Sequence, residues 1–247
     1  MKEIRRKFYL WLQKRLGREA DQFTVHGVQV NIPTTADFNI RYLLARGRPY
    51  EGPEARLIKA HLQHGSDVIE LGGCMGVISA VIRDRVGPEA RHVVVEADAG
   101  LASICKQNAE AGAEAGKTQV VVAAVDYSGA KTVNFASGKN AHVGHLAAEG
   151  EDGAAVPTTT LSALAAQIGE GPFSVVCDIE GAEIAMFENE AALMDRVQMI
   201  ILETHPKFYD GGAEAEAKLL ALLESYGMTL VARDDNVVCL LRLKPTP

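Results

Sequence analysis

The stretch Asp67-Val-Ile-Glu-Leu-Gly-Gly-Cys-Met-Gly76 decides the fold of this chain. Its first half is a short apolar run of the kind that forms a buried parallel strand. Gly72 and Gly73 then break the strand, and Gly76 opens a segment whose apolar residues recur at helical spacing. A strand, a glycine turn and a helix N-terminus together make a cradle that binds nucleotides in open α/β sheets.

The glycine spacing differs from the G-x-G-x-x-G fingerprint of dinucleotide-binding proteins, because Gly72 is followed directly by Gly73 and then by Gly76. The strand also ends in an acid, Glu70, which would repel a pyrophosphate and suits a ligand with a cationic end. S-adenosylmethionine (SAM) is such a ligand, since it carries an ammonium and a sulfonium. We therefore expect Glu70, Gly72, Gly73 and Gly76 to lie in a SAM site.

The rest of the chain alternates predicted strands and helices, which indicates a parallel sheet with helices on both faces. The predicted strands are 67–71, 91–96, 119–125, 173–177 and 199–202. The last two strands, 228–232 and 237–243, are too close in sequence for a parallel crossover and must form an antiparallel hairpin. We expect a doubly wound α/β fold with a seven-stranded, mostly parallel sheet and a C-terminal antiparallel hairpin strand, as in class I methyltransferases.

Two further regions complete the predicted organisation. Residues 1–52 form an N-terminal extension with a basic helix, a hairpin turning at His26-Gly27 and a helix over 36–46, and residues 53–247 form the main domain. In the middle of the chain, residues 137–155 are rich in Gly, Ala and His and are expected to be a loop. Short strands are predicted at 132–136 and 156–160, followed by a helix over 161–168.

The formal net charge of −7 argues against binding of a nucleic-acid backbone. Residues 1–18 are nevertheless strongly basic, and the same stretch places five apolar side chains on one helical face: Ile4, Phe8, Trp11, Leu12 and Leu16. One interpretation is a helix lying on an anionic membrane. The alternative, which we favour, is a helix packed on the domain or on a second subunit of a homo-oligomer. With no membrane-spanning run or signal peptide visible, we expect a cytoplasmic protein, with peripheral contact at the inner membrane surface left open.

Acidic residues stand at the end of five successive predicted strands, namely Glu70, Glu96, Asp126, Asp178 and Glu203. Ligands of open α/β sheets bind at these carboxyl ends, and a buried carboxylate is costly unless it is paired. Glu96 lies about 20 residues beyond the glycine turn, the spacing at which an acid binds ribose hydroxyls. The alternative, a charge at the next helix N-terminus, suits Asp98 better. Asp126 either accepts from the adenine amino group or forms the turn before Ser128.

Two short motifs carry the remaining candidate site residues. In Asp178-Ile-Glu-Gly-Ala-Glu183, we expect Asp178 and Glu180 to face the cleft, where Asp178 contacts the methionine ammonium or the acceptor. Glu183 is expected to favour the helix N-terminus through its charge. In Glu203-Thr-His205, the histidine has a reference pKa near neutrality, which suits removal of a proton from a hydroxyl. The alternative is a histidine that fixes its own loop.

Other candidates are less specific. His142 and His145 lie in the predicted loop and either close over the substrate or are simply exposed. Asp178, Glu203 and His205 together can hold a divalent ion, but no spacing demands one, so no metal is predicted. The four cysteines have no zinc-site spacing, and three lie in apolar segments as small core residues.

Five segments together resemble the FkbM family of SAM-dependent methyltransferases: Val68–Gly76, Val93–Asp98, Ala124–Gly129, Val176–Glu183 and Ile201–Pro206. The similarity covers residues 40–210, and the D-x-E-G-x-E segment is its most specific part, because a glycine turn alone is a weak signal. The chain has Glu70, Ala97 and Val176 where the family usually has Asp, Pro and Lys. The first two differences keep the chemistry, and the resemblance adds Ala97 to the expected cofactor site.

The resemblance implies O-methylation, with SAM as the methyl donor and a small or lipid-linked hydroxyl compound, such as a carbohydrate, as the acceptor. His205, Asp178 and Glu203 are the expected catalytic residues, with His205 as the first candidate for the base. Glu180, His142 and His145 are the expected substrate contacts. Two other classes remain open at this point: a nicotinamide-dependent oxidoreductase, and a SAM-binding partner protein or sensor without turnover.

Overall fold

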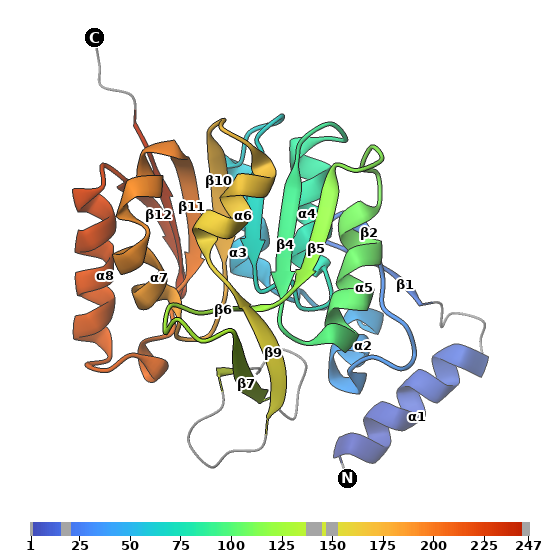
Figure 1. Ribbon diagram of the computed structural model, residues 1–247. Helices are drawn as coiled ribbons and strands as arrows, with labels where there is room; N and C mark the ends of the chain where they lie inside the picture. The colour runs from blue at the N-terminus through green and yellow to red at the C-terminus, as the bar shows by residue number, and fades with distance from the viewer. Residues whose placement is uncertain (1, 16–20, 137–144, 147–152, 244–247) are drawn as a thin grey trace.

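The computed structural model describes residues 2–15, 21–136, 145–146 and 153–243. At its centre is a seven-stranded sheet with the strand order β12-β13-β11-β10-β3-β4-β5 (Figure 1). Within this sheet β13 runs opposite to the other six strands, which confirms the predicted fold class and the C-terminal hairpin. The strands are β3 (Val68–Leu71), β4 (His92–Glu96), β5 (Thr118–Val122), β10 (Phe173–Cys177), β11 (Val197–Glu203), β12 (Thr229–Asp234) and β13 (Val237–Leu241).

Helices cover both faces of the sheet, as the buried central strands require (Figure 1). One face packs against α3 (Gly52–His61), α4 (Val77–Val86) and α5 (Ala99–Glu110). The other packs against α6 (Leu161–Ile168), α7 (Glu183–Asn189) and α8 (Ala213–Ser225), with the short 3₁₀ helices η1 (Ala191–Arg196) and η2 (Pro206–Phe208) beside β11 and α8. Side chains of β3 alternate between the two cores, so Val68 packs with α4 whereas Ile69 packs with α6 and α7.

A second, smaller sheet lies beyond the carboxyl end of β5. Its order is β6-β9-β7-β8, with β6 (Ala124–Val125), β7 (Thr132–Ala136), β8 (His145–Leu146) and β9 (Ala154–Thr159). The predicted strand 119–125 is therefore wrong at its end, because β6 leaves the central sheet and pairs with β9. The predicted loop over 137–155 is also wrong at 145–146 and 154–155, which are strand. The predicted strands 132–136 and 156–160 are confirmed as β7 and most of β9, whereas the first residues of β9 are exposed and have no apolar alternation that would reveal them.

The N-terminal hairpin forms as predicted, with β1 (Gln22–Val25) and β2 (Val28–Asn31) joined by two residues of positive φ, His26 and Gly27. It is followed by α2 (Phe38–Ala45). Apolar side chains of this extension, such as Val30 and Ile40, belong to the same buried cluster as α3 and α4. The division of the chain at residue 53 stays a prediction.

The basic helix α1 (Lys2–Arg15) lies beside α2 (Figure 1). It packs there through the side opposite to the one expected. Leu10 is buried, and Arg6 donates to Asn39 at 2.8 Å. The predicted apolar face is exposed, so packing of that face on the domain was wrong; its described members are Ile4, Phe8, Trp11 and Leu12. Leu16 lies outside the described residues. Among those that are described, no helix has both the length and the apolar character needed to cross a bilayer.

Candidate active site

A cavity of about 870 Å³ opens at the carboxyl ends of β10 and β11, within the size range of small-molecule sites. Its walls come from the segment that leads into α3, from the ends of β10 and β11, and from the turn between β12 and β13. Six carboxylic acids line it, namely Glu51, Glu54, Asp178, Glu180, Glu203 and Asp235. The other charged groups in its lining are His205, Arg56 and Lys207. The cavity is therefore strongly acidic.

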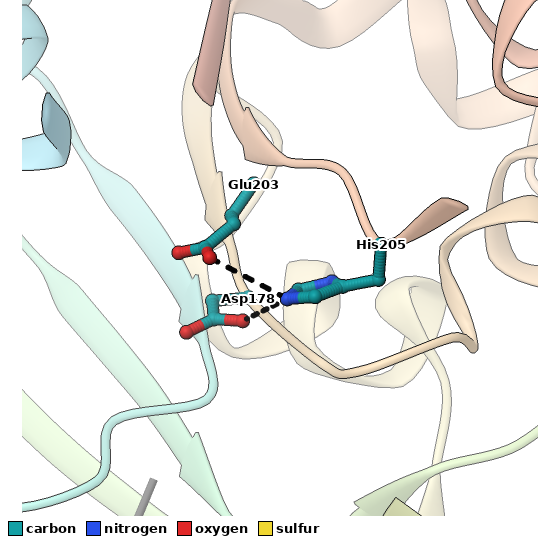
Figure 2. A group of neighbouring side chains, drawn as sticks. All are labelled: Asp178, Glu203 and His205. Carbon is teal, nitrogen blue, oxygen red and sulfur yellow. Dashed lines mark ion pairs between the residues drawn. The ribbon is translucent and has the colours of Figure 1, made fainter. Parts of the chain in front are cut away.

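Three of the predicted catalytic residues meet in this cavity (Figure 2). Nε2 of His205 lies 3.3 Å from Oδ1 of Asp178 and 3.6 Å from Oε1 of Glu203. Asp178 follows β10 and Glu203 ends β11, and these strands are parallel neighbours, so their carboxyl ends meet at one edge of the sheet. Glu180 lines the same cavity, in a backbone conformation of positive φ.

His205 is held in place from behind by a buried carboxylate. Glu183, the first residue of α7, is fully buried, and its Oε1 lies 2.8 Å from Nδ1 of His205. Its other oxygen accepts from the backbone N–H of Gly181 at 2.8 Å. The backbone N–H of His205 donates to the hydroxyl of Tyr209 at 3.1 Å. Glu183 therefore does more than favour a helix terminus by its charge, because it fixes the imidazole with Nε2 towards the cavity.

The crowding of carboxylates changes the proton affinity of this cluster. Burial lowers the pKa of His205, but the carboxylates of Glu183, Glu203 and Asp178 outweigh burial and raise that pKa to about 10. Burial and the charge of Glu203 raise the pKa of Asp178 to about 7. A histidine with such a pKa is protonated at neutral pH, so this arrangement does not supply the neutral imidazole that the predicted base needs.

Glu51 and Glu54 are site residues that were not predicted from the sequence. Glu54 is 3% exposed, and burial raises its pKa well above the ordinary value, with the charges of Asp178 and Glu51 adding to the effect. Burial also raises the pKa of Glu51 to about 8. A signal was present for Glu54, because it lies three and four residues before the buried Leu57 and Ile58 and so falls on the apolar face of α3.

The glycine turn lies next to the cavity. Gly72 has a φ of +91°, and a Cβ at this position would lie 1.9 Å from the carbonyl oxygen of Asp178. Only a glycine therefore allows the turn after β3 to approach the end of β10 this closely. Gly76 also has positive φ and precedes α4. Gly72 and Gly73 line a small hollow that shares Glu54 and Asp178 with the large cavity.

Glu96 ends β4 beside this turn. Its Oε2 accepts from the backbone N–H of Cys74 and its Oε1 from that of Asp98, each at 2.7 Å. The carboxylate is thus fixed at the rim of the glycine turn, where the ribose of a bound nucleotide would lie. The alternative role, capping of the next helix, belongs to Asp98, which accepts from two backbone N–H groups of α5. Ala97, between the two acids, is half-buried.

Glu70 is placed differently from the expectation of an acid turned towards a ligand. It is 1% exposed, and its two oxygens are engaged by the hydroxyl of Ser79 at 2.9 Å and by Nε2 of His92 at 2.8 Å. The polar groups around it therefore satisfy the buried carboxylate from within the core. It does border the small hollow at the glycine turn, and its contact with the ligand ammonium stays a prediction.

The remaining candidates lie apart from the cavity or outside the described residues. Asp126 follows β6 and accepts from the N–H and the hydroxyl of Ser128 at 3.0 and 2.6 Å, which is the turn role. Its contact with adenine stays a prediction. His142 lies outside the described residues, and the backbone of His145 pairs with Ala136 in the small sheet. Closure of these histidines over a substrate is likewise untested.

The residues present fit SAM. The shared hollow and cavity place the carboxylates of Glu54 and Asp178 beside the glycine turn, where a cationic methionine end is favoured. Glu96 still offers acceptor capacity to hydroxyl donors, since a carboxylate has about four lone-pair sites and two are used by backbone N–H groups. The donor set therefore matches the charge and the hydroxyls of this cofactor.

Solved structures with a similar fold include proteins described as methyltransferases. A protein described as a putative rRNA methylase from Clostridium thermocellum is 9% identical, with a TM-score of 0.50, covering 78% of this chain and 95% of that chain. A TehB-like SAM-dependent methyltransferase from Corynebacterium glutamicum is 14% identical, with a TM-score of 0.45 and coverages of 82% and 94%. A putative tRNA (m1A22) methyltransferase from Streptococcus pneumoniae, solved with SAM, is 14% identical, with a TM-score of 0.46 and coverages of 78% and 74%. The search of curated proteins gave no match.

The strand order and the acidic cavity at the strand ends define a class I methyltransferase fold. The family model for the methyltransferase FkbM domain matches residues 70–230, which is most of the chain. The chain therefore belongs to the FkbM methyltransferase domain family and is a SAM-dependent methyltransferase.

Proposed function

We propose that this enzyme transfers the methyl group of SAM to a hydroxyl of a carbohydrate, either free or linked to a lipid. The observation that carries the proposal is the acidic cavity of about 870 Å³ beside the glycine turn. Carboxylates accept hydrogen bonds from two hydroxyls at once, and neighbouring hydroxyls are the recognition groups of a sugar. Tyr50 and the prolines at 49 and 53 add apolar wall to the same cavity, against which a sugar ring can pack.

The chain's own residues then have distinct tasks. The glycine turn and Glu96 would hold the nucleoside part of SAM, and Glu54 and Asp178 would lie towards its cationic end. When bound, SAM supplies an electrophilic methyl group on sulfur. Asp178, Glu203 and Glu180 would accept hydrogen bonds from acceptor hydroxyls, and one of these carboxylates would take the hydroxyl proton as the methyl group passes from sulfur to oxygen. His205 would keep Asp178 and Glu203 in position. Holding the acceptor oxygen in line with the methyl group is the main source of acceleration that such a site offers.

The test is methyl transfer from labelled SAM to a panel of acceptors. The panel contains hydroxylated sugars, the matching amino sugars and a lipid extract, and the methylated atom is then located by NMR. We expect labelled product from hydroxylated sugars or from the lipid fraction, with the methyl group on oxygen. A methyl group found on nitrogen or carbon, or label transferred only to non-carbohydrate acceptors, would contradict the proposal.

The same assay separates turnover from mere binding. One outcome is that SAM binds in calorimetry while no acceptor in any fraction takes up label. That result would favour a SAM-binding partner protein without turnover over an enzyme. The Glu203→Gln variant serves as the matched reference, because its carboxamide has the same shape and lacks the charge. We expect this variant to bind SAM and to lose most of the labelled product.

A further inference from the structure

We propose that Asp178, Glu203 and His205 bind a divalent metal ion in the cavity. The three side chains offer two carboxylate oxygens and one imidazole nitrogen, and these donor atoms all lie within 4.8 Å of one another. Carboxylate oxygen suits Mg²⁺ and Mn²⁺, and imidazole nitrogen suits Zn²⁺ and other transition metals. Mn²⁺ and Zn²⁺ are therefore the ions that this mixed set favours.

The two separations from Nε2 of His205 to the carboxylate oxygens fit a shared ion better than direct hydrogen bonds. Nε2 of His205 is 3.3 Å from Oδ1 of Asp178 and 3.6 Å from Oε1 of Glu203, beyond the usual N–H···O range of about 2.7–3.2 Å. Donors bound at about 2.0–2.2 Å to one ion lie about 3.0–3.6 Å apart. Within the part of the chain that the structure describes, Oδ1 of Asp178 is buried and accepts no hydrogen bond.

The groups behind the donors are those that support a metal ligand. Metal-binding histidines commonly donate their other ring N–H to a carboxylate, and Glu183 lies 2.8 Å from Nδ1 of His205. Ligating carboxylates are themselves hydrogen-bonded, and Asn236 donates to Oε1 of Glu203 at 2.8 Å. The imidazole and the carboxylate are thus oriented before any ion binds.

A separate observation points to a cation in the same cavity. Glu54 lines it and is 3% exposed, and among the described residues its carboxylate has neither a hydrogen bond nor an ion pair. A buried carboxylate without a partner is costly, so a positive ligand is expected beside it. Arg56 does not supply that charge, because its guanidinium pairs with Asp234 at 2.6 Å. The cavity therefore gathers acidic groups whose charged form a bound cation would stabilise.

The proposal that the ion binds is argued from these contacts and does not depend on the proposed reaction. Its role, which is to hold and polarise the acceptor oxygen, rests on the proposed O-methylation. Metal binding can be measured in the absence of acceptor, so the two proposals can fail separately.

The experiment is calorimetric titration of the metal-free, full-length protein with Mn²⁺ and with Zn²⁺, supported by the EPR signal of Mn²⁺. We expect one ion per chain, and at least tenfold weaker binding in the Glu203→Gln and Asp178→Asn variants. The matched control is Glu188→Gln, an exposed carboxylate on α7, which should bind the ion like the native chain. Glu183→Gln should weaken binding by about 10–100-fold, as expected of a positioning residue.

Far-UV circular dichroism establishes that each variant is folded, and the two ligand variants test the site independently. No saturable binding of either ion would overturn the proposal. Binding that survives unchanged in both Glu203→Gln and Asp178→Asn would also overturn it, because the ion would then lie elsewhere. Methyl transfer at the full rate in the presence of a chelator, together with metal binding when the ion is supplied, would support the metal site but contradict its role in the reaction.

A second proposal concerns α1, and it is carried by a different observation. Four apolar side chains of this helix point away from the described chain: Ile4 is 71% exposed, Phe8 59%, Trp11 49% and Leu12 38%. The rings of Phe8 and Trp11 stack at 5.6 Å, so the patch is continuous across one helical turn. A patch of this kind marks an interaction surface.

The charge around this patch identifies the partner. Residues 1–18 carry seven lysines and arginines against one acid, although the whole chain has a formal net charge of −7. Lys7 is exposed beside the patch, and the guanidinium of Arg15 lies 5.1 Å from the ring of Trp11. Apolar side chains with basic flanks suit an anionic lipid surface, whereas pairing of this face with its counterpart on a second copy would bring the two basic segments together. We infer that α1 docks on anionic lipid.

The chain has one tryptophan, Trp11, so its fluorescence reports on this surface alone. We expect a blue shift and co-sedimentation with vesicles of phosphatidylglycerol and phosphatidylcholine, and no binding to phosphatidylcholine alone. Phe8→Glu should abolish sedimentation, whereas Leu230→Glu, at a similarly exposed position on β12, should not. Vesicle binding of Phe8→Glu equal to that of the native chain would overturn the proposal. So would a blue shift that appears without lipid as the protein concentration rises, together with dimer formation in ultracentrifugation.

Discussion

Glu183 and His205 lie 22 residues apart in the chain and meet through a contact of 2.8 Å between Oε1 and Nδ1. Glu183 is fully buried at the start of α7, and His205 follows β11 with 5% of its surface exposed. The contact joins the two most specific sequence motifs of the chain. It also decides which ring nitrogen faces the cavity, because Nδ1 is engaged and Nε2 is left towards Asp178 and Glu203.

Replacement of Glu183 by Gln should separate positioning from cofactor binding. The amide keeps the volume and can still accept from Gly181, but its NH₂ group would then face Nδ1 of His205 and could not accept a hydrogen bond from it. We expect methyl transfer to fall by about 10–100-fold, with SAM affinity changed less than about twofold. Labelled-SAM kinetics and calorimetry measure the two effects. Loss of SAM affinity equal to the loss of turnover would show that Glu183 serves the fold alone.

Glu96 gives a second prediction. If its carboxylate binds the ribose hydroxyls, Glu96→Ala should weaken SAM binding by about 1–3 kcal/mol, because a buried pair of acceptors is lost. Glu96→Gln should weaken it less, since one acceptor oxygen remains. Calorimetry on both variants checks the order of the effects. The control is Glu89→Gln, an exposed acid just before β4, and an affinity of Glu96→Ala equal to that of this control would refute the assignment.

The same residue predicts a dependence of stability on pH. Burial raises the pKa of Glu96 from its ordinary value to about 7, although backbone N–H groups of Asp98 and Cys74 act against this shift. A carboxyl with a raised folded pKa binds protons more tightly in the folded state. Its contribution to stability is therefore fully present below about pH 4.5 and is lost as the pH rises through about 7, by on the order of 3 kcal/mol.

Urea unfolding of the native chain and of Glu96→Gln at pH 5 and pH 8 measures this contribution as a difference. We expect the glutamine variant to gain stability relative to the native chain between the two pH values, since it has no proton to lose. A constant difference between the two proteins from pH 5 to pH 8 would show that the carboxyl of Glu96 titrates at its ordinary value.

The sheet could be predicted from the sequence because its central strands are buried on both faces and are short, mostly apolar segments between turn signals. β3, β4 and β10 all behave in this way. The antiparallel hairpin could be predicted because the connection between β12 and β13 is too short for a parallel crossover. The small sheet was predicted in part, since β7 and most of β9 were expected as strands, but the exposed first residues of β9 have no apolar period to detect.

The site was only partly predictable, since strand ends indicate where acids gather but not which way they face. Asp178 and Glu203 meet because β10 and β11 are neighbours, a relation that the strand order could suggest. Glu70 has the same position on its strand but is held in the core by Ser79 and His92, and both contacts are set by the packing of neighbouring elements. Glu54 comes from outside the family segments and enters the cavity only through the packing of α3.

The last prediction concerns the glycine turn. Gly72 and Gly112 both have positive φ, +91° and +81°, so an alanine is strained at either position. At Gly112 an added Cβ atom would have no neighbour within 4 Å, whereas at Gly72 the carbonyl oxygen of Asp178 would lie 1.9 Å from it. Gly112→Ala should therefore cost about 1 kcal/mol in unfolding free energy, and Gly72→Ala about 2–6 kcal/mol because overpacking adds to the strain.

Urea unfolding compares the two alanine variants, and SAM calorimetry adds a second readout. The clash at Gly72 must push the backbone of Asp178 away from the turn, so SAM affinity should fall in Gly72→Ala and stay unchanged in Gly112→Ala. Equal stabilities of the two variants would mean that φ alone governs this turn. That result would contradict the claim that the turn packs closely against the end of β10. The placement of the cofactor site beside the acidic cavity depends on this close packing.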